Sequence, residues 1–254
     1  METDVQFDGL LLLVQSVGVP LLLTLAGLAV SGACRRRTPR LAAAVLVVAV
    51  LLAFVGGCAA LSHEQWRFPP QQALDWLPPL ALASLTVPLA LEWRGAGARA
   101  WWLAQTPLAM AGVWPMLPPA LTDQGWSGAA VPGAGLAALC LGGWWLLDGA
   151  GSRRRAVAAL TLSAASLGLL VAMGGSIIIG ASALSLAAAL AVLWLGAGLR
   201  TPQPIPRAVV AGAAVLLTSI ATAAYFYAEM SPWLIACSLA CVPLSRWMRH
   251  SGGA

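Results

Sequence analysis

Few residues of this chain could do chemistry, and the most polar pair stands in one predicted loop. His63 and Glu64 are adjacent between two apolar runs. An imidazole beside a carboxylate could serve as a general base or contribute to a metal site. A zinc site needs three or four converging ligands, however, and the only other histidine, His250, falls on the opposite side of the predicted membrane. We therefore interpret this pair first as part of a solvated loop. An enzyme at the outer face that uses His63 and Glu64 is the last of the three functions considered below.

A second polar pattern follows one face of an apolar run near the C-terminus. Its four members are spaced by 4, 3 and 4 residues, which places them on one side of a helix: Thr218, Thr222, Tyr225 and Glu229. Gln105 adds an amide in a region rich in proline, where kinked helices can expose backbone carbonyls to a cavity. Together these residues predict a polar cleft for a small uncharged or cationic ligand. The alternative is helix packing, because hydroxyl and small side chains let membrane helices approach closely.

Other chemistry finds little support in the sequence. We see no phosphate-binding loop, dinucleotide fingerprint, catalytic triad or nucleic-acid motif. The five cysteines are odd in number and lie in or beside apolar runs, which argues against a disulfide framework. No ionisable side chain lies in the middle of an apolar run, and this weighs against a proton relay or voltage sensor. We therefore expect no catalytic residue, cofactor, metal or nucleic acid.

The composition decides which elements must carry these residues. The hydrophobic fraction is 60% and the charged fraction 9%, whereas soluble domains have about 45–50% and about 25%. Long, continuous apolar runs indicate membrane-spanning helices, since barrel strands alternate polar and apolar residues. The sequence predicts an all-α, polytopic bundle that forms a single transmembrane domain over 1–254, with no soluble domain.

Nine apolar runs are separated by short polar joints. Runs three, five and nine are shorter than the roughly 20 residues that a span needs. The predicted spans cover residues 9–31, 41–61, 76–91, 100–121, 133–147, 156–173, 177–199, 208–228 and 232–245.

The positions of the arginines predict how the spans are oriented. Every second joint is rich in arginine, and thirteen of the fourteen basic residues fall in these joints, Arg67 being the exception. Because short arginine-rich loops stay in the cytoplasm, we expect the N-terminus outside and the C-terminus inside. The compartment predicted is the bacterial cytoplasmic membrane. The expected partners are the lipid bilayer, with anionic lipid headgroups at the cytoplasmic face, and a membrane protein.

Three functions are consistent with these residues. The first is a non-catalytic membrane subunit or assembly partner, which the tiny loops and the lack of buried charge favour. The second is a small-solute permease whose cleft lies between the proline-kinked third and fourth spans and the eighth. The third is the outer-face enzyme described above.

Overall fold

The computed structural model describes residues 2–35, 38–61, 70, 72–118, 126–148, 152–199 and 204–243. These residues form helices and no strand, so the prediction of an all-α chain is confirmed. Each predicted apolar run contains a helix. The elements are α1 (Glu2–Arg35), α2 (Pro39–Leu61), the 3-10 turn η1 (Ala73–Trp76), α3 (Leu77–Trp93), α4 (Ala98–Val113), η2 (Trp114–Met116), α6 (Trp126–Asp148), α7 (Arg153–Met173), α8 (Ile177–Leu199), α9 (Arg207–Tyr227) and α10 (Pro232–Leu239).

Six helical segments of the described chain are long and apolar enough to cross a membrane. Helices α4 and α10 are shorter, with 16 and 8 residues, and α6 has 23. At 1.5 Å per residue an eight-residue helix covers about 12 Å of a hydrocarbon layer about 30 Å thick. The count of nine spans and their orientation therefore stay predictions. The six segments are Val14–Arg35, Pro39–Leu61, Ala73–Trp93, Arg153–Met173, Ile177–Ala197 and Arg207–Tyr227.

Two glycines end helices where the chain must reverse within a few residues. Gly95 after α3 and Gly175 after α7 have φ of 64° and 99°, a region that costs side-chain-bearing residues energy. The amide that follows each glycine bonds back to the carbonyl five residues earlier, at 3.0 Å after α3 and 3.2 Å after α7. This is the Schellman pattern of helix termination. It explains how the chain reverses between α7 and α8 within three residues, Gly174, Gly175 and Ser176.

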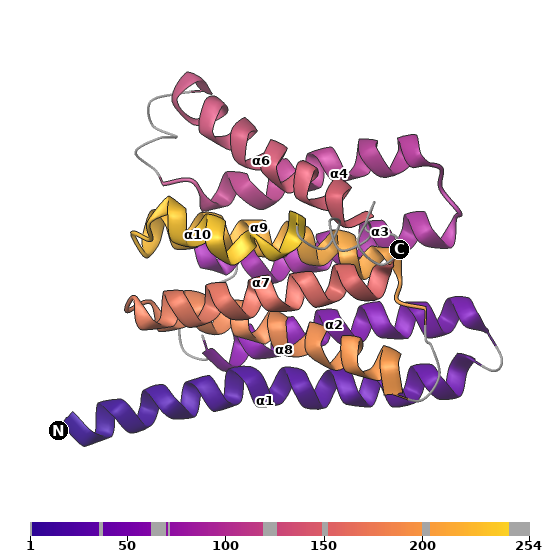
Figure 1. Cartoon of the computed structure of the whole chain (residues 1–254), viewed down its shortest axis with the longest axis horizontal. Coiled ribbons are helices and arrows are strands. Elements are labelled where there is room, and N and C mark those ends of the chain that lie inside the picture. The colour runs from indigo at the N-terminus through magenta and orange to yellow at the C-terminus, as the bar shows by residue number, and fades with distance from the viewer. Residues whose placement is uncertain are drawn as a thin grey trace, which may run out of the picture.

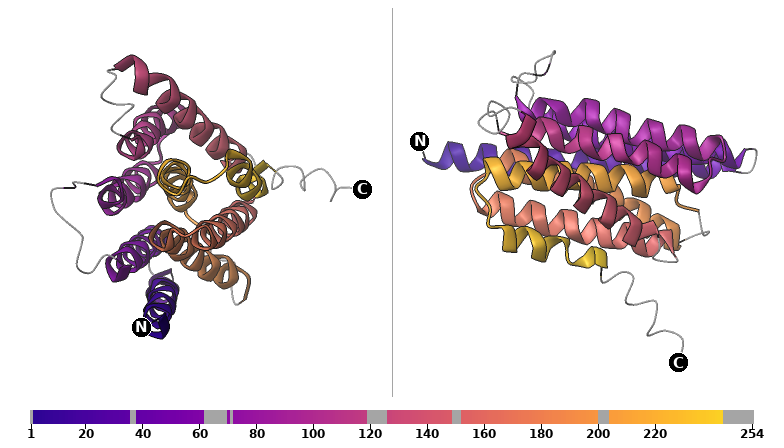
Figure 2. Two further views of the ribbon diagram at one scale, coloured as in Figure 1. Left: turned by 90° about the vertical axis from the view of Figure 1, so that its left-hand side faces the viewer. Right: turned by 90° about the horizontal axis from the view of Figure 1, so that it is seen from above.

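Helix α9 is the centre of the bundle. Every residue from Ala208 to Ala224 is buried except Thr218, which is half-buried. Helices α3, α4, α6, α7, α8 and α10 all contact it, and the end-on view in Figure 2 shows it surrounded by them. Helices α1, α2, α7 and α8 pack together on one side of α9, whereas α3, α4 and α6 lie on the other. Helix α9 is therefore buried along most of its length.

Glycines allow the closest helix contacts. A Cβ added to Gly212 of α9 would stand 2.5 Å from the carbonyl oxygen of Ser84 on α3. One added to Gly112 of α4 would stand 2.8 Å from Ser219 Oγ on α9. In membrane helices, small residues at such points permit the close packing that holds the bundle together. Helices α3 and α4 therefore meet α9 without a gap at these two levels.

Candidate functional site

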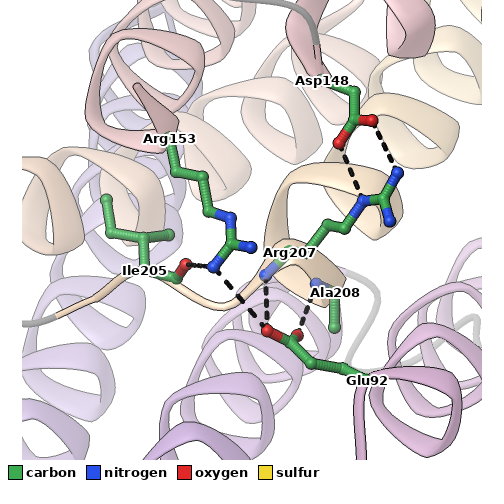
Figure 3. Close-up of polar contacts among 6 residues, drawn as sticks. All are labelled: Glu92, Asp148, Arg153, Ile205, Arg207 and Ala208. Carbon is green, nitrogen blue, oxygen red and sulfur yellow. Dashed lines mark hydrogen bonds and ion pairs between the residues drawn. The ribbon is translucent and has the colours of Figure 1, made fainter. Parts of the chain in front are cut away.

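Charged side chains from four helices meet at one end of the bundle, which is the right-hand end in Figure 1. We call Glu92, Asp148, Arg153 and Arg207 the charge cluster. Figure 3 shows its central contact, in which Arg207 Nε and Nη2 donate to the two carboxylate oxygens of Asp148 at 2.8 and 2.6 Å. Paired parallel bonds of this kind fix the geometry of both side chains. They tie the end of α6 to the beginning of α9.

Glu92 holds the same end of α9 from a different side. Its Oε1 accepts the Arg207 backbone N–H at 3.1 Å, and its Oε2 accepts that of Ala208 at 3.0 Å. The first amides of a helix have no partner within the helix, and a carboxylate there also meets the positive end of the helix dipole. Glu92 stands at the last turn of α3, so it caps a helix far from it in sequence. Arg153 Nη1 lies 3.9 Å from Glu92 Oε1 and donates to the Ile205 carbonyl at 3.1 Å.

Two tryptophans form the apolar side of the charge cluster. The Arg207 guanidinium lies 4.3 Å from the ring centroid of Trp101 and 5.5 Å from that of Trp144. Both rings are 2% exposed and stack with centroids 6.4 Å apart. A cation over a tryptophan face is attracted by the ring quadrupole, more strongly where water is excluded. The arrangement joins α4 to the same contact and gives every charged group of the cluster a structural partner.

A groove on the side of α9 away from α3 is a candidate binding site. It has a volume of about 740 Å³. It opens at the bundle surface, since Leu139, Trp145 and Tyr225 in its walls are 71%, 50% and 43% exposed. Helices α6, α9 and α10 form the walls, with Leu160 contributed by α7. The right-hand view in Figure 2 shows α6 crossing this side of the bundle obliquely.

The walls of the groove are almost entirely apolar. Thr218, Thr222 and Tyr225 line it, but the two threonine hydroxyls donate within α9, to the carbonyls of Ala214 at 2.9 Å and Thr218 at 2.8 Å. Because each hydroxyl donates its proton within the helix, it can offer a ligand only acceptor lone pairs. The groove is therefore suited to an apolar ligand.

The remaining residues of the predicted cleft lie elsewhere. Gln105 on α4 is 1% exposed and does not line the groove, and its Nε2 finds no acceptor among the described residues. Glu229 is exposed in the turn after α9, with φ 49°. His63 and Glu64 lie outside the described residues. The structure thus brings Thr218, Thr222 and Tyr225 together around one groove, and whether any predicted residue binds a ligand stays untested.

Sequence reasoning did not predict the charge cluster. One signal for it was present, because Glu92 and Asp148 are the only acidic residues in the arginine-rich joints. A carboxylate placed among many arginines is a good candidate for a structural pair. What the sequence could not show is that both acids converge on the beginning of α9, which follows them by more than fifty residues.

No group of three or more histidine, cysteine or acidic side chains that could hold a metal ion occurs in the part of the chain that the structure describes. Comparison of the chain with protein-family models, with curated proteins and with solved structures gives no match.

Proposed function

We propose that this chain is a nine-span integral membrane protein that serves as a non-catalytic membrane subunit or assembly partner. The observation that carries the proposal is how its polar atoms are used. Arg207 and Asp148 satisfy each other, Glu92 caps a helix, and the threonines of α9 bond to their own helix. The groove is lined almost entirely by apolar side chains. Such a molecule is equipped for association within the membrane.

The position of the arginine-rich joints supports the proposed topology. The C-terminal ends of α1, α3 and α6 lie at the same end of the bundle as the beginnings of α2, α4, α7 and α9. By the positive-inside rule this end faces the cytoplasm of a bacterial cell, with the N-terminus outside. Reporter fusions at each terminus test this directly. The expected result is an external N-terminus and a cytoplasmic C-terminus, and two termini in one compartment would refute the nine-span layout.

Association with a protein partner is tested by purification. Cells expressing the tagged chain are treated with a membrane-permeant cross-linker, and the protein is extracted in mild detergent and sized by native electrophoresis. A subunit is expected to run with a stoichiometric membrane protein partner. Migration of the chain as a lone monomer, both with and without the cross-linker, would refute this function.

A small-solute permease is the second function. The observation that favours it is the buried Gln105 Nε2, which finds no acceptor among the described residues. In that case Thr222→Leu and Glu229→Ala should reduce solute uptake into reconstituted vesicles. Gln105→Met adds a discriminating measurement. If the amide only fills space, removing a buried unsatisfied donor should leave stability unchanged or raise it by about 1 kcal/mol, with uptake unaffected. Loss of uptake in Gln105→Met without loss of stability would favour the permease.

The outer-face enzyme is the third function and predicts loss of turnover in His63→Ala. Activity equal to wild type in that variant would exclude it.

A further inference from the structure

We infer that the groove between α6, α9 and α10 binds the acyl chain of an anionic phospholipid whose headgroup lies at the arginine-rich end of α7. This inference uses only the membrane embedding in the proposed function and does not require a protein partner. It rests on the shape and lining of the groove and on the charge at one of its ends.

The dimensions of the groove fit a hydrocarbon chain. Its volume of about 740 Å³ falls in the range of about 300–1,000 Å³ typical of small-molecule sites. The α6 wall extends from Leu136 to Leu147, which is about 17 Å at the helical rise. One half of a hydrocarbon core about 30 Å thick has nearly that length. A lipid tail in one leaflet therefore matches the wall from end to end.

Some positions in the wall of the groove have free space beside them. A Cβ on Gly142 or Gly143 of α6 would meet no atom within 4 Å. Buried Gly212, in contrast, is needed for the contact of α9 with α3. Gly142 and Gly143 thus make the groove wider, and they are not needed for close contacts between the described helices.

The charge at one end of the groove is complementary to an anionic headgroup. Leu147, at this end, immediately precedes Asp148 of the charge cluster. Four arginines and two carboxylates gather here, because α7 begins with three arginines. Arg207 and Arg153 are engaged by Asp148 and Glu92, and Arg154 lies 5.9 Å from the Trp194 ring.

Arg155 is available to a headgroup. It is exposed, and no described carboxylate forms an ion pair with it. On α7 it shares a face with Leu162 and Ser166, and Ser166 Oγ lies 3.4 Å from the Ser238 carbonyl of α10. Arg155 therefore begins the face of α7 that leads to α10. It precedes Leu160, the residue that α7 contributes to the groove, by five residues, which is about 7.5 Å along the axis and about 140° around it. The proposed headgroup contact therefore lies beside the end of the groove and not on the face of α7 that carries Leu160.

Two pairs of matched variants test the site. Arg155→Gln removes the proposed headgroup contact, and Arg99→Gln removes an exposed arginine from the beginning of α4, away from the groove. Gly142→Leu fills the groove. Gly135→Leu is its control, because a Cβ at Gly135 also meets no atom within 4 Å and Gly135 does not line the groove. Each protein is reconstituted in vesicles of equal parts phosphatidylglycerol and phosphatidylcholine with identical chains. It is then extracted, and bound lipid is counted by native mass spectrometry.

Wild type should retain one phosphatidylglycerol in preference to phosphatidylcholine. An arginine near a headgroup is worth about 1 kcal/mol, so Arg155→Gln should weaken that preference about fivefold. Gly142→Leu should lose both lipids, while Arg99→Gln and Gly135→Leu should behave as wild type. Equal retention of the two lipids, equal effects of the two arginine changes, or full occupancy in Gly142→Leu would overturn the inference.

Further outcomes separate this inference from the proposed function. Selective lipid in a chain without a protein partner would refute the subunit and leave the lipid site standing. A stoichiometric partner without selective lipid would do the reverse. Cross-linking of Gly142→Cys to a partner polypeptide instead of lipid would show that a protein helix occupies the groove, and would also overturn the inference.

Discussion

Removing the Glu92 carboxylate should destabilise the bundle more than any other single change to a charged side chain of the charge cluster. Glu92 accepts two backbone N–H groups from the first turn of α9, at 3.1 and 3.0 Å. Its side chain is 26% exposed, so water reaches the site only partly. A hydrogen bond to a charged group contributes about 1.5–3 kcal/mol, and the lower figure applies where water can replace the carboxylate. Two such bonds give an expected loss of about 3 kcal/mol in Glu92→Ala.

Glu92→Gln refines the test because it keeps one carbonyl oxygen. We expect Glu92→Gln to lower the free energy of unfolding by about 1.5 kcal/mol, about half of the loss in Glu92→Ala. The substitution removes one acceptor and the interaction of the charge with the helix dipole. The assay is SDS titration of the refolded protein in mixed micelles, which yields the free energy of unfolding. Glu229→Ala is the control, because that glutamate is exposed and distant in sequence from the charge cluster. A loss below about 1 kcal/mol in Glu92→Ala would refute the capping argument.

The same titration tests three further features. A double-mutant cycle of Arg207→Gln and Asp148→Asn should give a coupling of about 0.5–1 kcal/mol, because the Asp148 side chain is 37% exposed; additive effects would show that the bidentate pair is not maintained in solution. Gly212→Ala should destabilise by about 1–3 kcal/mol through contact with α3, whereas Gly142→Ala should be neutral or stabilising, and equal effects would contradict the packing described for α9. Gly175→Ala should cost about 1–2 kcal/mol because φ there is 99°, and an unchanged midpoint would show that the turn relaxes.

The amino-acid sequence alone determined the class of the molecule and the positions of its helices. Continuous apolar runs have only one way to satisfy their backbone in lipid, which is the α-helix. The joint of three residues between the spans 156–173 and 177–199 is a turn for a local reason, namely that Gly175 adopts positive φ without strain. Such features can be predicted from the sequence because the residues that produce them are close together in the chain.

Only the tertiary structure decided which polar residues are used and where a ligand could enter. Gln105 and Thr218 were placed in one predicted cleft, yet of the two only Thr218 lines the groove, because helices α3 and α4 close on α9 at Gly212 and Gly112. Glu92 reaches α9 across more than one hundred residues of chain. Helical periodicity says which residues share a face but not which neighbour that face meets. The choice of neighbour depends on side-chain volumes summed over the whole bundle, and for this reason the groove and the charge cluster emerge only in three dimensions.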